Sequence, residues 1–370
     1  MDKVRYGVIG VKGMGTGHIR AIKSAANSEL VAVADIDEGA AQKCAAEHGV
    51  AAFGEWRKML LMPEVDVVCI CTPHPFHPKM AIAALEAGKA ALTEKPMAVT
   101  VSDADRMIEA ADRAGKPLGV VFQQRFSGQA ATIKRLMTEA VGTWYRAECV
   151  CTSMRTMNYY RSGDWRGTWT LEGGGVLINQ APHQLDIFQH YCGMPRRVMA
   201  WTRTLAHAIA VEDMVEALFE YDSGAVARLA CNTIDFTGSN RFEVWGYGAT
   251  VICDSQGLRI ARPDVPGDEF IRSSGKAWGE PATALEIVEP EKLPLSGHTA
   301  VIDDFSQALL EGRLPRVTGR EGRNSLEIAN AIVLSSKRAK VVELPLDRGE
   351  YDCLLGELQA EEVARQVLPR

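Results

Sequence analysis

Two short segments carry side chains suited to moving a proton. Lys95 stands in the Glu-Lys-Pro tripeptide 94–96, directly after an apolar run, and His183 follows the glycine triplet 173–175. A lysine ammonium can hydrogen-bond a reacting oxygen and stabilise alkoxide character, and it can take a proton where burial lowers its pKa. Histidine titrates near neutral pH, which favours His183 as the general base. Asn179 is neutral, so it can orient a hydroxyl group but cannot act as an acid or base.

A glycine turn near the start of the chain is suited to binding phosphate. An apolar run leads through several glycines into helix-forming residues in YGVIGVKGMGTGHIRA, and such a turn offers backbone amides and the positive end of a helix to a pyrophosphate. Gly10, Lys12 and Gly15 occupy the three glycine positions of the usual Gly-x-Gly-x-x-Gly pattern, so a lysine replaces the middle glycine. We expect Gly13, Met14 and Gly15 to supply most backbone contacts. Lys12 either points to solvent or lies near the pyrophosphate, where its charge offsets lost contacts.

The next apolar run ends in a carboxylate. The segment LVAVADID places Asp35 there, with Ile36 beside it and Asp37 as a nearby competitor. An acidic residue at this point hydrogen-bonds the adenosine ribose hydroxyls of a dinucleotide. Because a carboxylate would repel a 2′-phosphate, and no arginine lies beside Asp35, NAD is favoured over NADP.

The elements that position these residues alternate along the first part of the chain. Short apolar runs and helical patterns follow one another, which is typical of βαβ units and a parallel sheet. Pro78 opens one helix that closes at Gly88, and Ser102 with Asp105 predicts a capping-box start for another that stops at Gly115. The expected strands are 5–10, 30–34, 66–71, 90–93 and 118–122. We therefore predict a doubly wound Rossmann domain over residues 1–125, in an α/β chain.

The pattern changes after residue 125. Strand-like runs joined by turn residues indicate an α+β domain over residues 126–370, with a large, mostly antiparallel open sheet. We expect this domain to bind substrate and to oligomerise, and its C-terminal helices can pack back on the first domain. The expected strands are 144–154, 197–205, 214–221, 225–234, 241–247 and 250–254, and the expected helices are 130–140, 299–311, 323–339 and 351–368.

Composition and charge exclude several classes of protein. The 370 residues exceed one ordinary core, and the net charge of -6 argues against nucleic-acid or anionic-membrane partners. No run approaches the length of a membrane helix, and the start of the chain has no signal-peptide pattern. The nine scattered cysteines fit reduced thiols in a cytoplasm. The pairs 69/71 and 149/151 are interpreted as buried thiols on one strand face, and no metal site is expected.

The order of these motifs resembles the glucose–fructose oxidoreductase/inositol dehydrogenase (Gfo/Idh/MocA) family. The resemblance covers nearly the whole chain: after the Rossmann half come CTPHPFH at 71–77, ALTEKPMAVT, QQRF at 123–126, WRGTWTLEGGGVLINQAPHQLD at 165–186 and GREGRNSLEIANAIVLSS at 319–336. The family's Glu-Lys-Pro lysine maps to Lys95, and its histidine after the glycine triplet maps to His183. Two departures stand out. Family members with a matching turn have glycine where this chain has Lys12, and many polyol dehydrogenases have aspartate where it has Asn179.

The resemblance and the fold together imply a set of site residues. His74 and His77 follow the third expected strand. We expect them to line the nicotinamide ribose region and not to act in catalysis. The aromatic and arginine side chains of 158–169 suit the faces and rims of sugar rings. The expected cofactor contacts are Gly10, Lys12, Gly13, Met14, Gly15, Asp35, Ile36, Thr72, Pro73, His74, His77, Glu94, Lys95, Gln124, Trp165 and Arg166. The expected substrate contacts are Lys95, Arg125, Tyr159, Arg161, Asn179, His183 and Asp186.

The reaction that this implies is oxidation of a ring hydroxyl of a sugar, glycoside or cyclic polyol, with hydride passing to nicotinamide C4. Two alternatives remain open. One is a redox-assisted enzyme that cleaves a glycosidic bond and keeps NAD bound. The other is a catalytically silent regulator that senses NAD or sugar, against which the presence of both Lys95 and His183 argues. An uncovered sheet face needs a partner, so a homodimer or homotetramer is expected.

Overall fold

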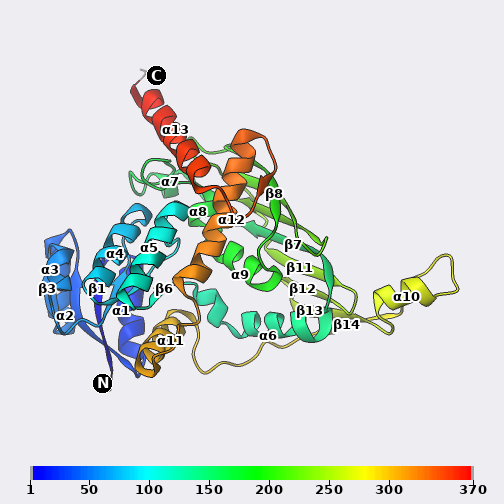
Figure 1. Cartoon of the computed structure of the whole chain (residues 1–370), viewed down its shortest axis with the longest axis horizontal. Helices are drawn as coiled ribbons and strands as arrows, with labels where there is room; N and C mark the ends of the chain where they lie inside the picture. Colours follow the sequence, from blue (N-terminus) through cyan, green and yellow to red (C-terminus); the bar gives the residue numbers. More distant parts are fainter. Residues whose placement is uncertain (1–2, 368–370) are drawn as a thin grey trace. The chain divides into compact units, whose positions relative to one another are not determined.

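The computed structural model describes residues 3–367, and these form two compact units (Figure 1). The first unit takes in the chain from residue 3 to 126 together with 171–173 and 294–326. The second takes in 127–170, 174–293 and the chain from residue 327 onward. No described helix is long and apolar enough to cross a membrane.

A six-stranded parallel sheet forms the centre of the first unit. Its strands are β1 (Val4–Ile9), β2 (Ser28–Ala34), β3 (Ala51–Phe53), β4 (Val67–Ile70), β5 (Ala90–Thr93) and β6 (Leu118–Val120). The order is β3-β2-β1-β4-β5-β6, so the direction of winding reverses between β1 and β4. Doubly wound sheets bind ligands at the carboxyl ends of their strands at such a reversal. The topology thus places a ligand site at the ends of β1 and β4.

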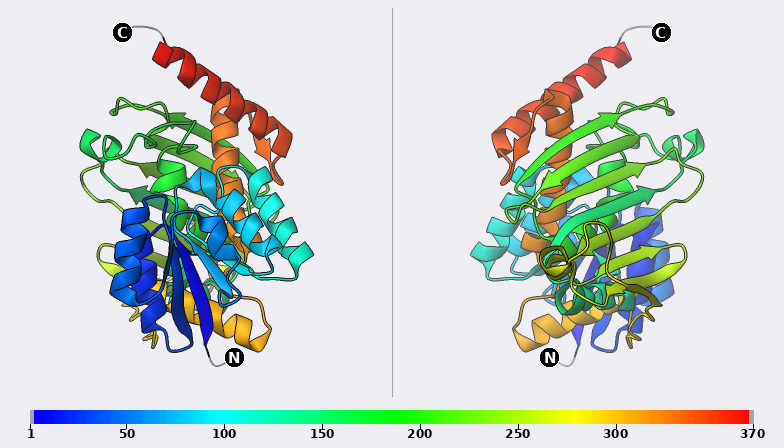
Figure 2. Two further views of the ribbon diagram at one scale, coloured as in Figure 1. Left: turned by 90° about the vertical axis from the view of Figure 1, so that its left-hand side faces the viewer. Right: turned by 90° about the vertical axis from the view of Figure 1, so that its right-hand side faces the viewer.

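Helices connect these strands and flank the sheet (Figure 2, left). They are α1 (Met14–Ser24), α2 (Glu38–His48), α3 (Trp56–Leu60), α4 (His77–Glu86) and α5 (Val101–Ala114), with the short turns η1 (His74–Phe76) and η2 (Gln123–Phe126). A later helix, α11 (Gly297–Glu311), packs beside α1. Tyr6 of β1 is fully buried and shares a 2.8 Å hydrogen bond with Ser306 of α11. A late segment of the chain therefore completes the core of the first unit.

A nine-stranded sheet forms the second unit. Its order is β14-β13-β12-β11-β7-β10-β9-β8-β15, and every pair except β7 and β10 is antiparallel. The strands are β7 (Trp144–Thr152), β8 (Arg197–Arg203), β9 (Met214–Glu220), β10 (Val226–Asn232), β11 (Arg241–Gly246), β12 (Thr250–Asp254), β13 (Gly257–Pro263), β14 (Thr283–Ile287) and β15 (Val342–Glu343).

Helices pack on one face of this sheet, and the other face is largely open to view (Figure 2, right). Those in contact with its strands include α8 (Val176–Asn179), α9 (Pro182–Cys192) and the π-turn η3 (Met137–Val141), which follows α6 (Gly128–Leu136). The unit also contains α7 (Met157–Tyr160), α13 (Arg348–Val367) and α10 (Gly267–Ser273), which lies in the projecting connection between β13 and β14 (Figure 1). A long helix, α12 (Gly319–Arg338), begins in the first unit and ends in the second. Alternate side chains of β8 to β10 are buried, as one covered face requires.

The fold class expected from the sequence is confirmed, with local corrections. The predicted capping box at Ser102 is wrong, because the side chain of Thr100 caps α5 by accepting a hydrogen bond from the amide of Asp103. The elements that were not predicted include the short helices α3, α7, α8 and α10 and the strands β3, β13, β14 and β15. All five residues of β14 are exposed, so its sequence lacks the apolar alternation that marks a half-buried strand. The predicted helix end at Leu368 lies outside the described residues.

The close packing at the start of α1 gives a first prediction. A Cβ on Gly15 would lie 1.8 Å from the carbonyl oxygen of Gly10, whereas a Cβ on Gly17 of the same helix would meet nothing within 4 Å. We expect Gly15→Ala to lower the free energy of unfolding by about 1 to 3 kcal/mol and to weaken dinucleotide binding. Gly17→Ala is the matched control, and it should be neutral or stabilising by up to about 1 kcal/mol. Urea unfolding and calorimetric titration with NAD measure both effects, and equal behaviour of the two variants would contradict this packing.

Candidate active site

The glycine turn after β1 has the shape that a pyrophosphate needs. Gly10 has a φ of +88°, and a Cβ there would lie 2.8 Å from the carbonyl oxygen of Cys71. Gly13 caps the start of α1 with a φ of +52°. The close approach at Gly15 lets α1 pack directly on the end of β1. These are the positions at which a dinucleotide fingerprint requires a tight turn and close packing of strand and helix, so the residues present fit such a cofactor.

The end of β2 is organised by two carboxylates. Asp35 accepts hydrogen bonds from the amides of Val11 at 3.0 Å and of Asp37 at 2.9 Å. Lys12 donates to the carboxylate of Asp37 over 2.7 Å, and both side chains remain about half exposed. This hydrogen bond raises the pKa of Lys12 and lowers that of Asp37. Lys12 therefore reaches toward the corner expected to hold the adenosine ribose, where Ile36 is 99% exposed.

His77 ties the ends of β4 and β5 together. Its Nε2 lies 2.6 Å from the carbonyl oxygen of Thr72, and its Nδ1 lies 2.9 Å from that of Pro96. The ring is fully buried, and burial lowers the pKa of this imidazole. Nearby His74 is 7% exposed, and its pKa is lowered well below the ordinary value, chiefly by burial. His77 thus fixes the loop that contains Lys95 beside the loop that contains Thr72 and Pro73.

A buried ion pair lies directly before Lys95. The carboxylate of Glu94 is 2.6 Å from Nε2 of His18 on α1 and 3.8 Å from Nε2 of His298 on α11. The other carboxylate oxygen accepts from the backbone amide of Lys95 at 3.1 Å. Burial alone would raise the pKa of Glu94, but the hydrogen bond and charge of His18 outweigh it and lower this pKa to about 2. Glu94 is therefore a permanent anion that anchors the backbone of Lys95, whose side chain is half-buried.

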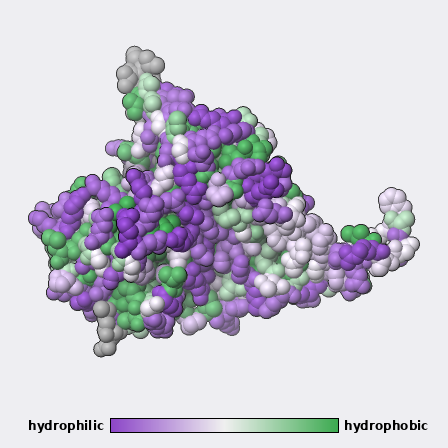
Figure 3. Space-filling model, in the orientation of Figure 1, coloured by the Kyte–Doolittle hydropathy of each residue, from purple (hydrophilic) through white to green (hydrophobic). Residues whose placement is uncertain are grey.

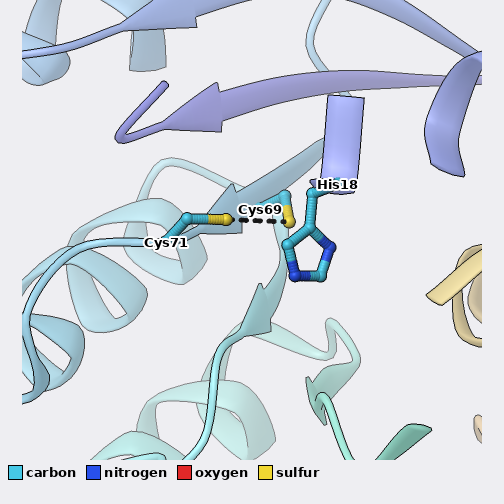
Figure 4. A group of neighbouring side chains, drawn as sticks. All are labelled: His18, Cys69 and Cys71. Carbon is cyan, nitrogen blue, oxygen red and sulfur yellow. Dashed lines mark hydrogen bonds between the residues drawn. The ribbon is translucent and has the colours of Figure 1, made fainter. Parts of the chain in front are cut away.

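The thiol of Cys69 lies between the imidazole of His18 and the thiol of Cys71 (Figure 4). The sulfurs of Cys69 and Cys71 are 3.8 Å apart and form a hydrogen bond. That bond and the charge of His18 lower the pKa of Cys69 to about 6 against the effect of burial. Burial would lower the pKa of His18, yet Cys69 and Glu94 raise it to about 10. Among the described residues, two groups have ligand atoms close enough for a metal ion, His18 with Cys69 and Cys71, and His18 with Glu94 and His298. Both groups need His18, whose Nε2 is already hydrogen-bonded to Glu94.

Arg125 lies in the η2 turn after the parallel sheet, next to Gln124. Its side chain is 2% exposed and forms an ion pair with Glu321 at the start of α12. The predicted substrate contact at this position is therefore an arginine held by a carboxylate of its own unit. The pairing was not visible in the sequence, because 196 residues separate the two side chains.

In the second unit, the hydroxyl of Tyr159 gathers three predicted or neighbouring site residues. It accepts hydrogen bonds from Arg166 at 2.6 Å, from Asn179 at 3.0 Å and from Gln180 at 3.0 Å. The guanidinium of Arg166 also stacks on the rings of Tyr159 and Trp165, at 4.3 and 4.2 Å. The result is a rigid cluster of donors and aromatic faces, which matches the chemistry of a sugar site.

The helix α9 carries the remaining predicted residues. Pro182 occupies its first turn and His183 is half-buried beside it, while Asn179 ends the separate short helix α8. Asp186 is fully buried and accepts from the side chain of Gln189 at 3.5 Å. Arg161 is exposed at the end of α7.

The fold defines a class of protein: a Rossmann-type, doubly wound domain combined with a second domain built on a large, mostly antiparallel sheet. Comparison with known proteins identifies the family. Residues 4–122 match the model described as the oxidoreductase family with an NAD-binding Rossmann fold, and residues 131–252 match the Gfo/Idh/MocA C-terminal domain. The chain belongs to the Gfo/Idh/MocA oxidoreductase family.

Several relatives of known name are dehydrogenases. The WlbA dehydrogenase of Chromobacterium violaceum, solved in complex with NADH and UDP-GlcNAcA, is 30% identical with a TM-score of 0.81 over 94% of this chain and 97% of that chain. D-Apiose dehydrogenase of Paraburkholderia graminis is 26% identical over 93% of this chain and 90% of its own length. A 1-carboxy-3-chloro-3,4-dihydroxycyclohexa-1,5-diene dehydrogenase of Comamonas testosteroni is 34% identical over 59% of this chain, and the match spans 55% of that relative.

The shared imidazole gives a pH prediction. In Cys69→Ser, the 2.6 Å ion pair with Glu94 remains, and we expect it to hold the pKa of His18 above its unfolded value of 6.5, so that the folded chain binds the extra proton. The free energy of unfolding of this variant should then fall as the pH rises from 6.5 through the raised pKa of His18, by about 1.4 kcal/mol for each pH unit of the shift that remains. In the wild type, the lowered pKa of Cys69 acts oppositely between pH 6 and 9, so the slope is shallower.

Urea unfolding at three pH values in this range measures the difference. The exposed Cys353 gives the control variant, Cys353→Ser, which should keep the wild-type slope. If the free energy of unfolding changes with pH equally in Cys69→Ser and in the wild type, His18 and Cys69 do not shift each other's pKa.

Proposed function

We propose that this protein is an NAD-dependent dehydrogenase that oxidises a ring hydroxyl of a sugar, glycoside or cyclic polyol to the ketone. The observation that carries the proposal is the anchoring of Lys95 by buried Glu94, in the same unit as a glycine turn that fits a pyrophosphate. Family membership and the named relatives, which include sugar dehydrogenases and a dehydrogenase bound to NADH and a nucleotide sugar, support the substrate class. The proposal keeps residues 1–125 as the cofactor domain and 126–370 as the substrate domain.

The cofactor contacts follow from the first unit. The amides around Gly13 and Gly15 would hold the pyrophosphate, and Asp35 would face the adenosine ribose. Thr72, Pro73, His74 and the Glu94 segment would line the nicotinamide half. When bound, the dinucleotide supplies a hydride acceptor at nicotinamide C4. We assign Gln124, Trp165 and Arg166 to the same half by the order of the family motifs.

Lys95 and His183 share the proton chemistry in this proposal. Lys95 hydrogen-bonds the reacting oxygen and stabilises alkoxide character, because an ammonium group offers a full positive charge to a developing negative one. His183 takes the proton as general base. Asn179, Tyr159, Arg161, Arg125 and Asp186 would bind the remaining hydroxyl groups. The hydrogen bond between Asn179 and Tyr159 supports this grouping for the second unit.

Substitution of the two residues tests the assignment. Lys95→Met and His183→Asn should each lower kcat by a factor of about 100 or more, because each removes a group that acts on the reacting oxygen. Lys79→Met changes an exposed lysine on α4 and should leave kcat unchanged. The assay follows NADH formation with a panel of monosaccharides, inositols and glycosides. Turnover that survives Lys95→Met undiminished would remove Lys95 from the mechanism, and it would favour a regulator or a reaction of another kind.

Coenzyme choice gives a separate prediction. The carboxylates of Asp35 and Asp37 should repel a 2′-phosphate, so we expect Kd for NAD to be lower than Kd for NADP. Asp35→Ala should narrow this difference by about tenfold, since it removes one charge and one ribose acceptor. Lys12→Gly should leave NAD binding largely intact. Titration calorimetry with both dinucleotides measures these constants, and tighter binding of NADP by the wild type would refute the choice of NAD.

We also propose that the open face of the nine-stranded sheet forms a homodimer or homotetramer interface. Trp201, Leu218 and Val226 lie on that face and are 44 to 52% exposed, among ion pairs such as Arg228 with Glu216. The hairpin between β13 and β14 projects from the same unit and exposes Trp278 at 91% (Figure 3, right). Apolar surface of this kind is normally covered. Sedimentation at micromolar concentration should show a dimer or tetramer, and a monomer would contradict the proposal.

A further inference from the structure

Glu212 is a buried carboxylate that no proposed catalytic step uses. It lies two residues before the start of β9, is 2% exposed, and accepts hydrogen bonds from three consecutive backbone amides. Its Oε1 accepts from Gly175 at 2.9 Å and from Leu177 at 3.2 Å, and its backbone oxygen accepts from Val176 at 3.0 Å. One residue thus fixes the end of the glycine triplet and the start of α8.

The close approach of Glu212 requires a glycine at the third position of the triplet. A Cβ on Gly175 would lie 1.8 Å from the carbonyl oxygen of Glu212. Any other residue would push Glu212 out of reach of the three amides. The glycine that the sequence pattern marks before the histidine is therefore half of a clamp, and Glu212 is the other half.

The clamp is connected to α9 by continuous hydrogen bonds. The amides of Gln180 and Ala181 donate to the carbonyl of Val176 at 3.1 and 2.8 Å. The amide of Leu185, two residues after His183, donates to Ala181 at 2.9 Å. Because each turn is bonded to the one before it, a displacement of residues 175–177 would be transmitted to Asn179 and His183.

The surroundings of Glu212 make its charge costly. Its Oε2 has no hydrogen-bond partner among the described residues. Burial raises the pKa of Glu212 to about 7, although its own backbone amide, the amides of Leu177 and Gly175, and the positive charge of Lys337 on α12 lower it. Tyr351 of α13 faces the same carboxylate, and the pKa of its buried hydroxyl is raised. Asp213, the next residue, turns away and accepts from the amides and ring of the 205–207 loop.

We propose that Glu212 is a positioning residue, which holds Asn179 and His183 in the geometry of proton transfer through the backbone amides of residues 175–177. This inference rests on the proposed function, since it gives Glu212 a role in the reaction assigned to His183. The carboxylate binds the amides more tightly than the neutral acid does, because charged acceptors form stronger hydrogen bonds. Ionisation of Glu212 therefore tightens the loop as the pH rises through neutrality.

The variant Glu212→Gln tests this role without unfolding the chain. The amide keeps an acceptor oxygen for Gly175 and Leu177 but removes the charge and its titration. Because a buried unpaired charge is costly, stability above pH 7 should not fall. We expect kcat to drop about tenfold and KM for NAD to stay unchanged, since neither Glu212 nor residues 175–177 are among the proposed dinucleotide contacts. The pH profile of kcat should lose an inflection near pH 7. Glu212→Ala should lower kcat about a hundredfold, and Glu289→Gln, at an exposed site, should change nothing.

Hydrogen exchange separates the inference from the proposed function. In Glu212→Gln, the amides of residues 175–177 should exchange faster, while peptides from β1 and α1 keep their wild-type rates. Unchanged kcat and an unchanged pH profile would overturn the role of Glu212, whatever the exchange shows. A wild-type chain that turns over no member of the carbohydrate panel would instead overturn the proposed function. Reduced kcat with wild-type exchange at 175–177 would also reject the clamp as the cause.

Discussion

The packing of the first unit depends on compensating the buried charge of the Glu94 carboxylate. A buried anion is strongly unfavourable unless it is paired and hydrogen-bonded, and Glu94 meets this need with His18, His298 and the amide of Lys95. Its partners come from three different parts of the chain: the helix after the glycine turn, the loop after β5 and the late helix α11. Folding of the unit must bring all three together before the charge is compensated. The position of the Lys95 backbone is therefore a consequence of core electrostatics.

The second unit uses buried carboxylates differently. Glu212 and Asp213 hold backbone amides instead of a cation, and each fixes a loop on its own side of β9. Asp213 has a lowered pKa because several amides and His207 outweigh the effect of its burial. Glu212 has a raised pKa because burial outweighs its two amide bonds. Neighbouring residues of similar chemistry thus differ in charge near neutral pH, and only Glu212 is able to respond to pH in that range.

The sequence predicted the features that depend on local pattern. Gly10 and Gly15 follow from the strand-turn-helix pattern, and the structure shows the close contacts that exclude larger residues there. The placement of Pro182 in the first turn of α9 was also readable from the residue type. The alternation of short apolar runs with helical patterns is also local, and it predicted the parallel sheet. The structure adds the order and register of the strands, and these are consistent with the local patterns.

Features that depend on distant pairing were not predictable. His298 lies 204 residues after Glu94, and nothing near it in sequence marks it as a partner. His18 gave a weak signal, since it falls on the buried side of α1, but a buried histidine alone does not name its partner. The hydrogen bond from Lys12 to Asp37 was not foreseen, although the lysine side chain is 64% exposed, in line with one of the two orientations expected for it. The roles of Lys95 and His183 stay predictions, because they concern a substrate.

Transfer of deuterium tests the central claim most directly. The protein is incubated with NAD and with monosaccharides, an inositol and a glycoside that carry deuterium at the carbinol carbons. The mass of the recovered dinucleotide is then measured by mass spectrometry. Our account predicts that at least one of these compounds gives a ketone and a reduced dinucleotide that has gained one deuterium at nicotinamide C4. If the dinucleotide gains none, and the substrate is unchanged or loses its deuterium only to water, the protein does not oxidise ring hydroxyls and the account is wrong.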